Sequence, residues 1–187
     1  MLPVTLTGCA EPPDKEINQA QGAIAAARAA GAETFASTEY KAAAEALDKA
    51  RQAVSQRDYR LALNHALDAR ERAETAARTA ADEKARARAA AEAAWQSAQQ
   101  ALQASKGALD AARDARVTER RLTPFNRAID QVEHALLSLR SRIDQGDLIA
   151  PTEELVAAKA KLDQVRSEID AAATARSAQK SPASKRR

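Results

Sequence analysis

Cysteine, glycine, proline and aromatic residues are all scarce in this sequence of 187 residues. It has one cysteine, five glycines, six prolines and 3% aromatic residues. The single cysteine excludes an intramolecular disulfide and a cysteine-rich metal site. No apolar run approaches the roughly 20 residues that a membrane-spanning helix needs. No alternating run of β-branched residues is present from which a strand could form.

Alanine supplies most of the apolar content, with 50 residues in the chain. It is the best helix former because it loses no side-chain entropy in a helix, but it buries little surface. Acidic and basic residues are interleaved, which is typical of solvated helix faces. The sequence therefore predicts an all-α fold. We expect an elongated antiparallel bundle of about five helices, with coiled-coil-like packing and one very long central helix.

Capping residues and breaks divide the chain into predicted helices over residues 14–30, 38–55, 59–116, 123–144 and 151–173. Gly31 is expected to end the first helix in the left-handed conformation. Thr123 and Pro124 are expected to begin the fourth, since proline is favoured at the first helical position. Apolar stripes with a period of three and four residues predict core anchors at Tyr40, Leu47, Trp95, Phe125, Ile129 and Leu136.

A weak internal repeat emerges at an offset of 85 residues, which places Tyr40 on Phe125 and Leu47 on Val132. We therefore predict an N-terminal helical module over residues 10–80 and a C-terminal three-helix module over 95–173. Between them, residues 81–94 are rich in alanine and charge and predict a helical spacer. Residues 1–9 are interpreted as a truncated signal with a lipobox, and residues 174–187 as a disordered basic tail.

The only cysteine lies in the sequence Leu6-Thr7-Gly8-Cys9, which resembles a lipobox, the site at which bacterial lipoproteins are acylated. A proline-containing tether, Ala10-Glu11-Pro12-Pro13, follows it. Only eight residues precede Cys9, none of them basic, so either the true start lies upstream or the match is accidental. In the second case the N-terminus is cytoplasmic and its thiol is free. Ala10 resembles an outer-membrane sorting signal.

The order of lipobox, tether and Ala-rich helix resembles a family of bacterial lipoproteins that is classed as a domain of unknown function. The matching parts are residues 6–9, 23–32, 39–40, 47–50 and 58–62, followed by Ala66 and Ala69. The last part also looks like half of a tetratricopeptide repeat. The resemblance covers about residues 6–80 and implies an anchored helical hairpin without a catalytic residue.

Residues suited to catalysis or metal binding are few and scattered. His65 and His134 lie on different helices without a neighbouring ligand set, and the carboxylates Asp144, Asp147, Glu153 and Glu154 surround an exposed turn. We therefore expect no enzyme activity, metal, cofactor or small-molecule substrate. Contacts with an anionic surface, or alternatively a merely solubilising role, are assigned to the tail residues Lys180, Lys185, Arg186 and Arg187.

These observations predict a non-catalytic cell-envelope lipoprotein that acts as a helical interaction or spacer module. Its expected partners are the outer membrane, through lipid on Cys9 on the periplasmic side, and an unidentified envelope protein. One alternative is a soluble periplasmic chaperone or adaptor, which would need an exposed apolar groove. A second is a cytoplasmic coiled-coil binding protein, although a nucleic-acid partner is not expected from so few clustered charges.

Overall fold

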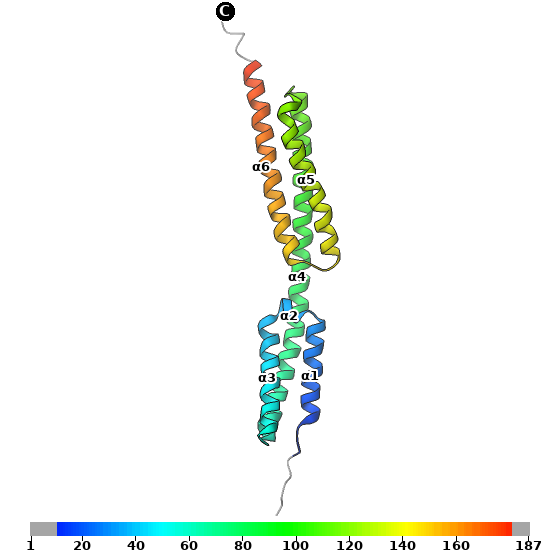
Figure 1. Ribbon diagram of the computed structural model, residues 1–187, viewed down its shortest axis with the longest axis vertical. Coiled ribbons are helices and arrows are strands. Elements are labelled where there is room, and N and C mark those ends of the chain that lie inside the picture. The colour runs from blue at the N-terminus through cyan, green and yellow to red at the C-terminus, as the bar shows by residue number, and fades with distance from the viewer. Residues whose placement is uncertain (1–10, 181–187) are drawn as a thin grey trace, which may run out of the picture. The chain divides into compact units, whose positions relative to one another are not determined.

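The computed structural model describes residues 11–180, and helices take up 90% of this range (Figure 1). No strand is present in the described range. The helices are α1 Asp14–Ala29, α2 Ala32–Phe35, α3 Ser37–Ser55, α4 Tyr59–Asp114, α5 Glu119–Asp144 and α6 Ile149–Lys180. The predicted all-α fold with one very long helix is thus confirmed. At 1.5 Å per residue the 56 residues of α4 span about 84 Å.

The chain forms two compact units, of which the first ends at Arg86 and the second begins at Ala87. Unit 1 contains α1, α2, α3 and the first part of α4. Unit 2 contains the rest of α4 together with α5 and α6. The boundary falls inside the predicted spacer, residues 81–94.

In unit 1, α1 and α4 run in parallel and α3 runs antiparallel to both (Figure 1). Its core is made almost entirely of alanine. Because the alanine side chain is small, the helices can approach closely. One cluster joins Tyr40 of α3 to alanines from α1, α2 and α4 and to Ala36 between α2 and α3, and a second is built around Leu47. The buried alanines of these clusters are Ala20, Ala27, Ala32, Ala36, Ala46, Ala69, Ala76 and Ala80.

Unit 2 has a core of larger side chains. Its three helices alternate in direction along the chain (Figure 1), and α5 and α6 pack against one another. Serine at position 105 is buried and donates its hydroxyl to the carbonyl oxygen of Leu162 at 3.1 Å. The fully buried bulky side chains are Leu122, Ile129, Ile143, Leu155, Leu162 and Ile169. The predicted apolar stripes of α5 and α6 supply most of them.

The turns after α3 and after α5 have the same backbone hydrogen bonds. At the first, the amide of Asp58 donates to Ala53 O at 3.0 Å and the amide of Arg57 to Val54 O at 2.9 Å. At the second, Asp147 donates to Arg142 O and Gly146 to Ile143 O. Each turn places one residue at a positive φ, 60° at Arg57 and 92° at Gly146. This is the Schellman motif that satisfies the last carbonyls of a helix.

These turns correct the predicted register of the internal repeat. They align Asp58 with Asp147, an offset of 89 residues, where the sequence suggested 85. At the offset of 89, buried Tyr40 corresponds to buried Ile129 and Leu47 to Leu136. The offset of 85 instead paired Tyr40 with Phe125, which is only half-buried. Pairing the two aromatic residues gave the wrong offset, because whether a residue is buried depends on how many residues separate it from the turn.

The predicted start of the fourth helix at Thr123-Pro124 is wrong. Helix α5 begins at Glu119, so Pro124 lies inside it. The extra turn brings Leu122 into the core, where it is fully buried. Without an amide hydrogen Pro124 cannot donate to the carbonyl of Arg120, and the burial of Leu122 outweighs the loss of this bond. A short helix, α2, was also missed; it follows Gly31, whose φ of 91° is the left-handed conformation expected at the end of α1.

Two predicted boundaries near exposed segments also change. Residues 174–180 belong to α6 and not to a disordered tail, since alanines at 171–173, 175 and 178 favour continued helix. The predicted spacer is shorter than 81–94, because Ala91 is buried in unit 2. Over residues 81–90 no side chain is buried. Alanine lines the core on either side of this segment, so composition alone did not mark its limits.

Candidate functional site

Several residues singled out in the sequence lie outside residues 11–180. These are Cys9, Lys185, Arg186 and Arg187; Lys180 ends α6, but its side chain is not described. The start of α1 is described: the amide of Asp14 donates to Pro12 O at 2.9 Å and the amide of Ile17 to Pro13 O at 3.0 Å. The first helix therefore begins five residues after Cys9.

The six predicted core anchors are not equivalent in the structure. Tyr40, Leu47, Ile129 and Leu136 are buried. Trp95 and Phe125 are only half-buried, because each lies at the edge of an apolar stripe and not at its centre. Both rings therefore offer part of their surface to solvent or to a partner.

Each of two aromatic rings is covered by an arginine. In unit 1 the Cζ of Arg28 lies 5.8 Å from the ring centroid of Tyr40, and in unit 2 the Cζ of Arg140 lies 5.7 Å from that of Trp95. At such distances the guanidinium is attracted to the ring face. A hydrogen bond to Glu33 raises the pKa of Arg28.

Arg140 also connects two helices of unit 2 by charge. Its guanidinium donates to Glu92 of α4 at 2.7 Å and lies 3.0 Å from Asp144 of α5. The hydrogen bond to Glu92 is the first cause of its raised pKa. Both carboxylates contact the same cation, so the cluster fastens α5 to α4.

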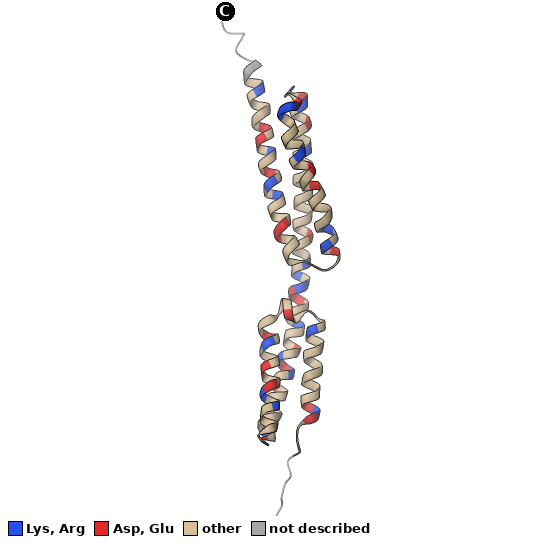
Figure 2. Cartoon of the chain, viewed as in Figure 1, with Lys and Arg blue, Asp and Glu red and all other residues tan. Residues whose placement is uncertain are grey.

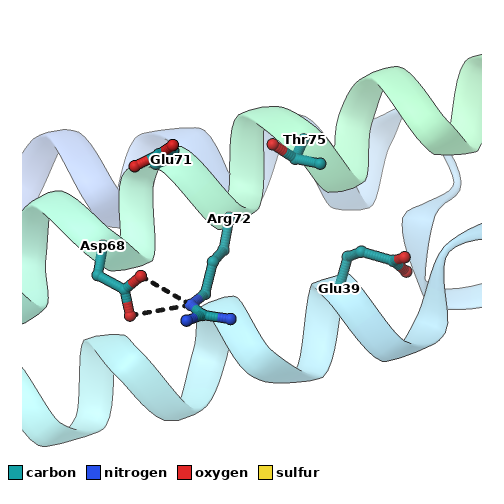
Figure 3. Close-up of a pocket in the computed structure, with 5 residues that line it drawn as sticks. All are labelled: Glu39, Asp68, Glu71, Arg72 and Thr75. Carbon is teal, nitrogen blue, oxygen red and sulfur yellow. Dashed lines mark hydrogen bonds and ion pairs between the residues drawn. The ribbon is translucent and has the colours of Figure 1, made fainter.

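The surface of unit 1 carries a shallow depression of about 300 Å³ between α3 and α4, with acidic character. Figure 3 shows Glu39 reaching it from α3 and Asp68, Glu71, Arg72 and Thr75 from α4. The Nε of Arg72 donates to both carboxylate oxygens of Asp68 at 2.8 Å, and this hydrogen bond raises the pKa of Arg72. Figure 3 also shows Glu39 and Glu71 on separate helices, directed away from this pair.

An arginine lies among the carboxylates near the α5–α6 turn. Arg142 lies between two of them, 2.8 Å from Asp147 and 2.6 Å from Glu154. His65 is in unit 1 and His134 in unit 2. Within residues 11–180 no three His, Cys, Asp or Glu side chains are grouped as a metal site would require. None of the helices in that range is long and apolar enough to span a membrane.

An apolar groove of about 330 Å³ runs between α5 and α6. It is lined by small and aliphatic side chains and by a few polar ones: Gln131, Val132, Ala135, Leu139, Glu154, Ala157, Ala158 and Lys161. Leu137 and Val156, elsewhere on the same two helices, are 64% and 58% exposed. The surface of unit 2 thus has apolar positions beyond its own core.

Sequence reasoning missed the arginines that organise these surfaces. Arg140 bridges Glu92 and Asp144, and Glu92 is too far away in sequence for a local pattern to mark it. Arg142 contacts Asp147 and Glu154, which lie within twelve residues but on the other side of the turn. One signal was available: Glu92 and Asp144 are charged residues that border the apolar stripes of α4 and α5. To assign either carboxylate to Arg140, one has to know the register of α4 relative to α5, and the turns determine that register.

Residues 15–92 match the model of a family described as a domain of unknown function, DUF4398. The matched range covers nearly all of α1, α2 and α3 together with the first part of α4, and it begins after Cys9. No curated protein and no solved structure matches the chain.

Proposed function

We propose that this chain is a non-catalytic lipoprotein of the bacterial cell envelope, anchored by lipid on Cys9, whose helices act as an interaction or spacer module. The observation that carries the proposal is the lipobox-like Leu6-Thr7-Gly8-Cys9 followed by a proline-containing tether. Helix α1 begins directly after the prolines, so the folded part of unit 1 starts within a few residues of the proposed anchor. Ala10 favours the outer membrane, on the side facing the periplasm.

The anchor is tested by expression in a Gram-negative host with an alkyne-labelled palmitate. The natural upstream sequence is included, because a signal needs a basic and an apolar region. We expect label in the wild-type chain and its recovery with outer membranes. Cys9→Ser should abolish both, whereas Thr7→Ser, which keeps a small residue in the lipobox, should preserve them. Equal membrane recovery of wild type and Cys9→Ser would refute the anchor and favour the cytoplasmic alternative.

The spacer part of the proposal is supported by the exposure of residues 81–90 within α4. Each unit buries its own core, and these ten residues contribute to neither. Deletion of residues 82–88 removes two helical turns and shortens α4 by about 10 Å while nearly preserving the helical phase. We expect both units to remain folded, as measured by circular dichroism and urea unfolding.

A deletion of equal length within the core of unit 2 provides the control. Removal of residues 96–102 takes away the buried Ala98 and Leu102 and shifts Glu92 relative to Arg140. This variant should lose most of the stability of unit 2. If deletion of residues 82–88 is equally destabilising, the segment is part of a continuous core and the spacer role is wrong.

A further inference from the structure

Positive charge is concentrated in two segments of the sequence. Residues 113–127 contain five arginines and two carboxylates, and residues 171–187 contain five basic residues and no carboxylate. Together these 32 residues carry a formal charge of +8, whereas the whole chain carries +3. The other 155 residues therefore have a net charge of −5. Three of these eight net positive charges lie in residues 113–127, far from the C-terminus in sequence, so the tail alone does not reveal them.

The fold of unit 2 brings the two segments to the same end. Helix α6 runs antiparallel to α5, and residues 168–172 of α6 lie beside the first turns of α5, with the last turns of α6 continuing past them (Figure 1). Arg121 and Phe125 of α5 and Glu168, Ala171 and Ala172 of α6 line one depression of about 470 Å³. Figure 2 shows Lys and Arg along the first turns of α5. We call this end, comprising residues 113–127 and 171–180, the basic end of unit 2.

The arginines of the basic end are exposed and largely without acidic partners. Arg116, Arg120, Arg121 and Arg127 are all exposed, and within residues 11–180 no carboxylate lies within 4.0 Å of their side-chain nitrogens. Arg113, in contrast, is close to Asp110 at 2.8 Å and to Glu119 at 3.4 Å. The four arginines are thus free to bind an anion from outside the chain.

Local stability does not account for these arginines. Arg116 has a φ of 59°, a conformation for which glycine is favoured. Arg120 and Arg121 occupy the first turn of α5, where the helix dipole favours acidic residues. Three of the four arginines are therefore at positions that the fold itself would fill differently.

We propose that the basic end of unit 2 binds the surface of a membrane that contains anionic phospholipids. Clusters of four to eight basic residues next to a helical segment are attracted to such surfaces. The charge of this end is spread over the turn before α5 and over two helix ends, which suits a planar array of headgroups. Half-buried Phe125 and the alanines beside it add an apolar area that can enter the headgroup region.

A nucleic-acid strand is the less suitable ligand. Proteins that bind single strands combine a basic groove with several aromatic side chains on which bases stack. Phe125 is the single aromatic residue in residues 113–127 and 171–187.

The proposal does not depend on lipid at Cys9, since it concerns residues of unit 2 alone.

The test uses the full chain with Cys9→Ser, so that no anchor contributes, and measures co-sedimentation with vesicles. Vesicles of phosphatidylcholine are compared with vesicles in which about one-third is phosphatidylglycerol, at low and at physiological salt. Binding is expected only to the anionic vesicles and should weaken with salt. The variant R116Q/R120Q/R121Q/R127Q should reduce the partition coefficient by at least about tenfold, since each basic residue near the surface contributes about fivefold.

The matched control removes four exposed basic residues elsewhere, R57Q/R60Q/K84Q/R88Q, and loses the same net charge. It should bind anionic vesicles nearly as well as the parent chain. An equal loss in both variants would mean that net charge and not the basic end is responsible, and would overturn the proposal. Absence of vesicle binding, or tighter binding to a single-stranded oligonucleotide that depends on the same four arginines, would overturn it as well. Circular dichroism of both variants checks that they are folded.

Discussion

The hydroxyl of Ser105 in α4 donates a hydrogen bond of 3.1 Å to the carbonyl oxygen of Leu162 in α6. Among the described residues Ser105 is the one buried polar side chain, and its neighbours in the core are aliphatic. As part of α6, the carbonyl of Leu162 also accepts an intrahelical bond. The hydroxyl of Ser105 therefore bonds to the second lone pair of this carbonyl oxygen. The contact sets the register of α4 relative to α6.

Removal of this hydroxyl should have a small effect and enlargement of the side chain a larger one. Ser105→Ala should lower the free energy of unfolding by about 1 kcal/mol, because the carbonyl keeps its intrahelical partner. Ser105→Leu should cost about 1–3 kcal/mol through overpacking. Urea unfolding followed by Trp95 fluorescence measures both. A stabilising Ser105→Leu would show that the space around the hydroxyl is larger than the structure indicates.

The ion pairs of Arg140 should contribute to stability in a salt-dependent way. Arg140→Met keeps an apolar stem over Trp95 but removes the contacts with Glu92 and Asp144. We expect a lower urea midpoint and a changed Trp95 emission, with the difference from wild type shrinking at high salt. Arg166→Met is the control, because Arg166 has a single long contact of 3.9 Å with Asp170. Equal effects of the two substitutions would contradict a specific role for Arg140.

Two of the four described residues with a left-handed backbone are arginines, and glycine should stabilise these two turns. Arg57 has a φ of 60° and Arg116 a φ of 59°, whereas the equivalent position after α5 is Gly146. Since left-handed backbone costs a non-glycine residue about 1 kcal/mol, Arg57→Gly and Arg116→Gly should each raise the free energy of unfolding by about 0.5–1 kcal/mol. Gly146→Ala should lower it. Thermal and urea unfolding measure the sign.

Two apolar residues of α5, Ile129 and Phe125, differ in how far they are buried. Ile129 is 1% exposed, and Ile129→Ala should cost about 2–5 kcal/mol through the cavity that it leaves. Phe125 is half-buried, so that Phe125→Ala should cost less than Ile129→Ala despite the larger side chain. A larger loss for Phe125, measured by urea unfolding under the same conditions, would place the core nearer the start of α5.

The fold class, the long helix and the apolar stripe of α5 could be predicted because each depends on local sequence. Alanine content favours helix, and residues Ile129 and Leu136 recur at helical spacing. The start of α5 could not be predicted from Thr123 and Pro124, because burial of Leu122 outweighs a local preference for proline at the first position. Tertiary contacts decided that boundary.

The surfaces were harder to predict than the helices. The sequence marked the basic tail at Lys185 to Arg187, but that residues 171–180 of α6 and the start of α5 lie at one end of unit 2 follows from the antiparallel arrangement of the two helices. Alanine occurs in the exposed segment 81–90 as well as at most buried positions of α4, so that composition did not distinguish buried Ala80 from the exposed positions after it.

The cores of the two units bury side chains of different size, although the α3–α4 hairpin of unit 1 corresponds to the α5–α6 hairpin of unit 2 at the offset of 89 residues. Buried positions of α4 in unit 1 hold alanine where α6 holds a large aliphatic residue. The pairs are Ala66 and Leu155, Ala73 and Leu162, Ala76 and Val165, and Ala80 and Ile169. Because buried area provides most of the stabilisation, unit 1 should be the less stable of the two.

Unit 1 should therefore unfold before unit 2, and the chain carries its own probes for both. Trp95 is the single tryptophan and lies in unit 2, whereas Tyr40 and Tyr59 are the two tyrosines and lie in unit 1. In a urea titration, far-ultraviolet circular dichroism should begin to fall at a lower concentration than Trp95 fluorescence changes. Amides of α1 and α3 should likewise exchange with deuterium sooner than those of α5 and α6. Leu162→Ala should lower the Trp95 transition and bring the two together, whereas Leu47→Ala should lower only the first. Coincident transitions in the wild type, shifted equally by both substitutions, would mean that α4 couples the units into one cooperative body, since two-state unfolding requires all probes to agree.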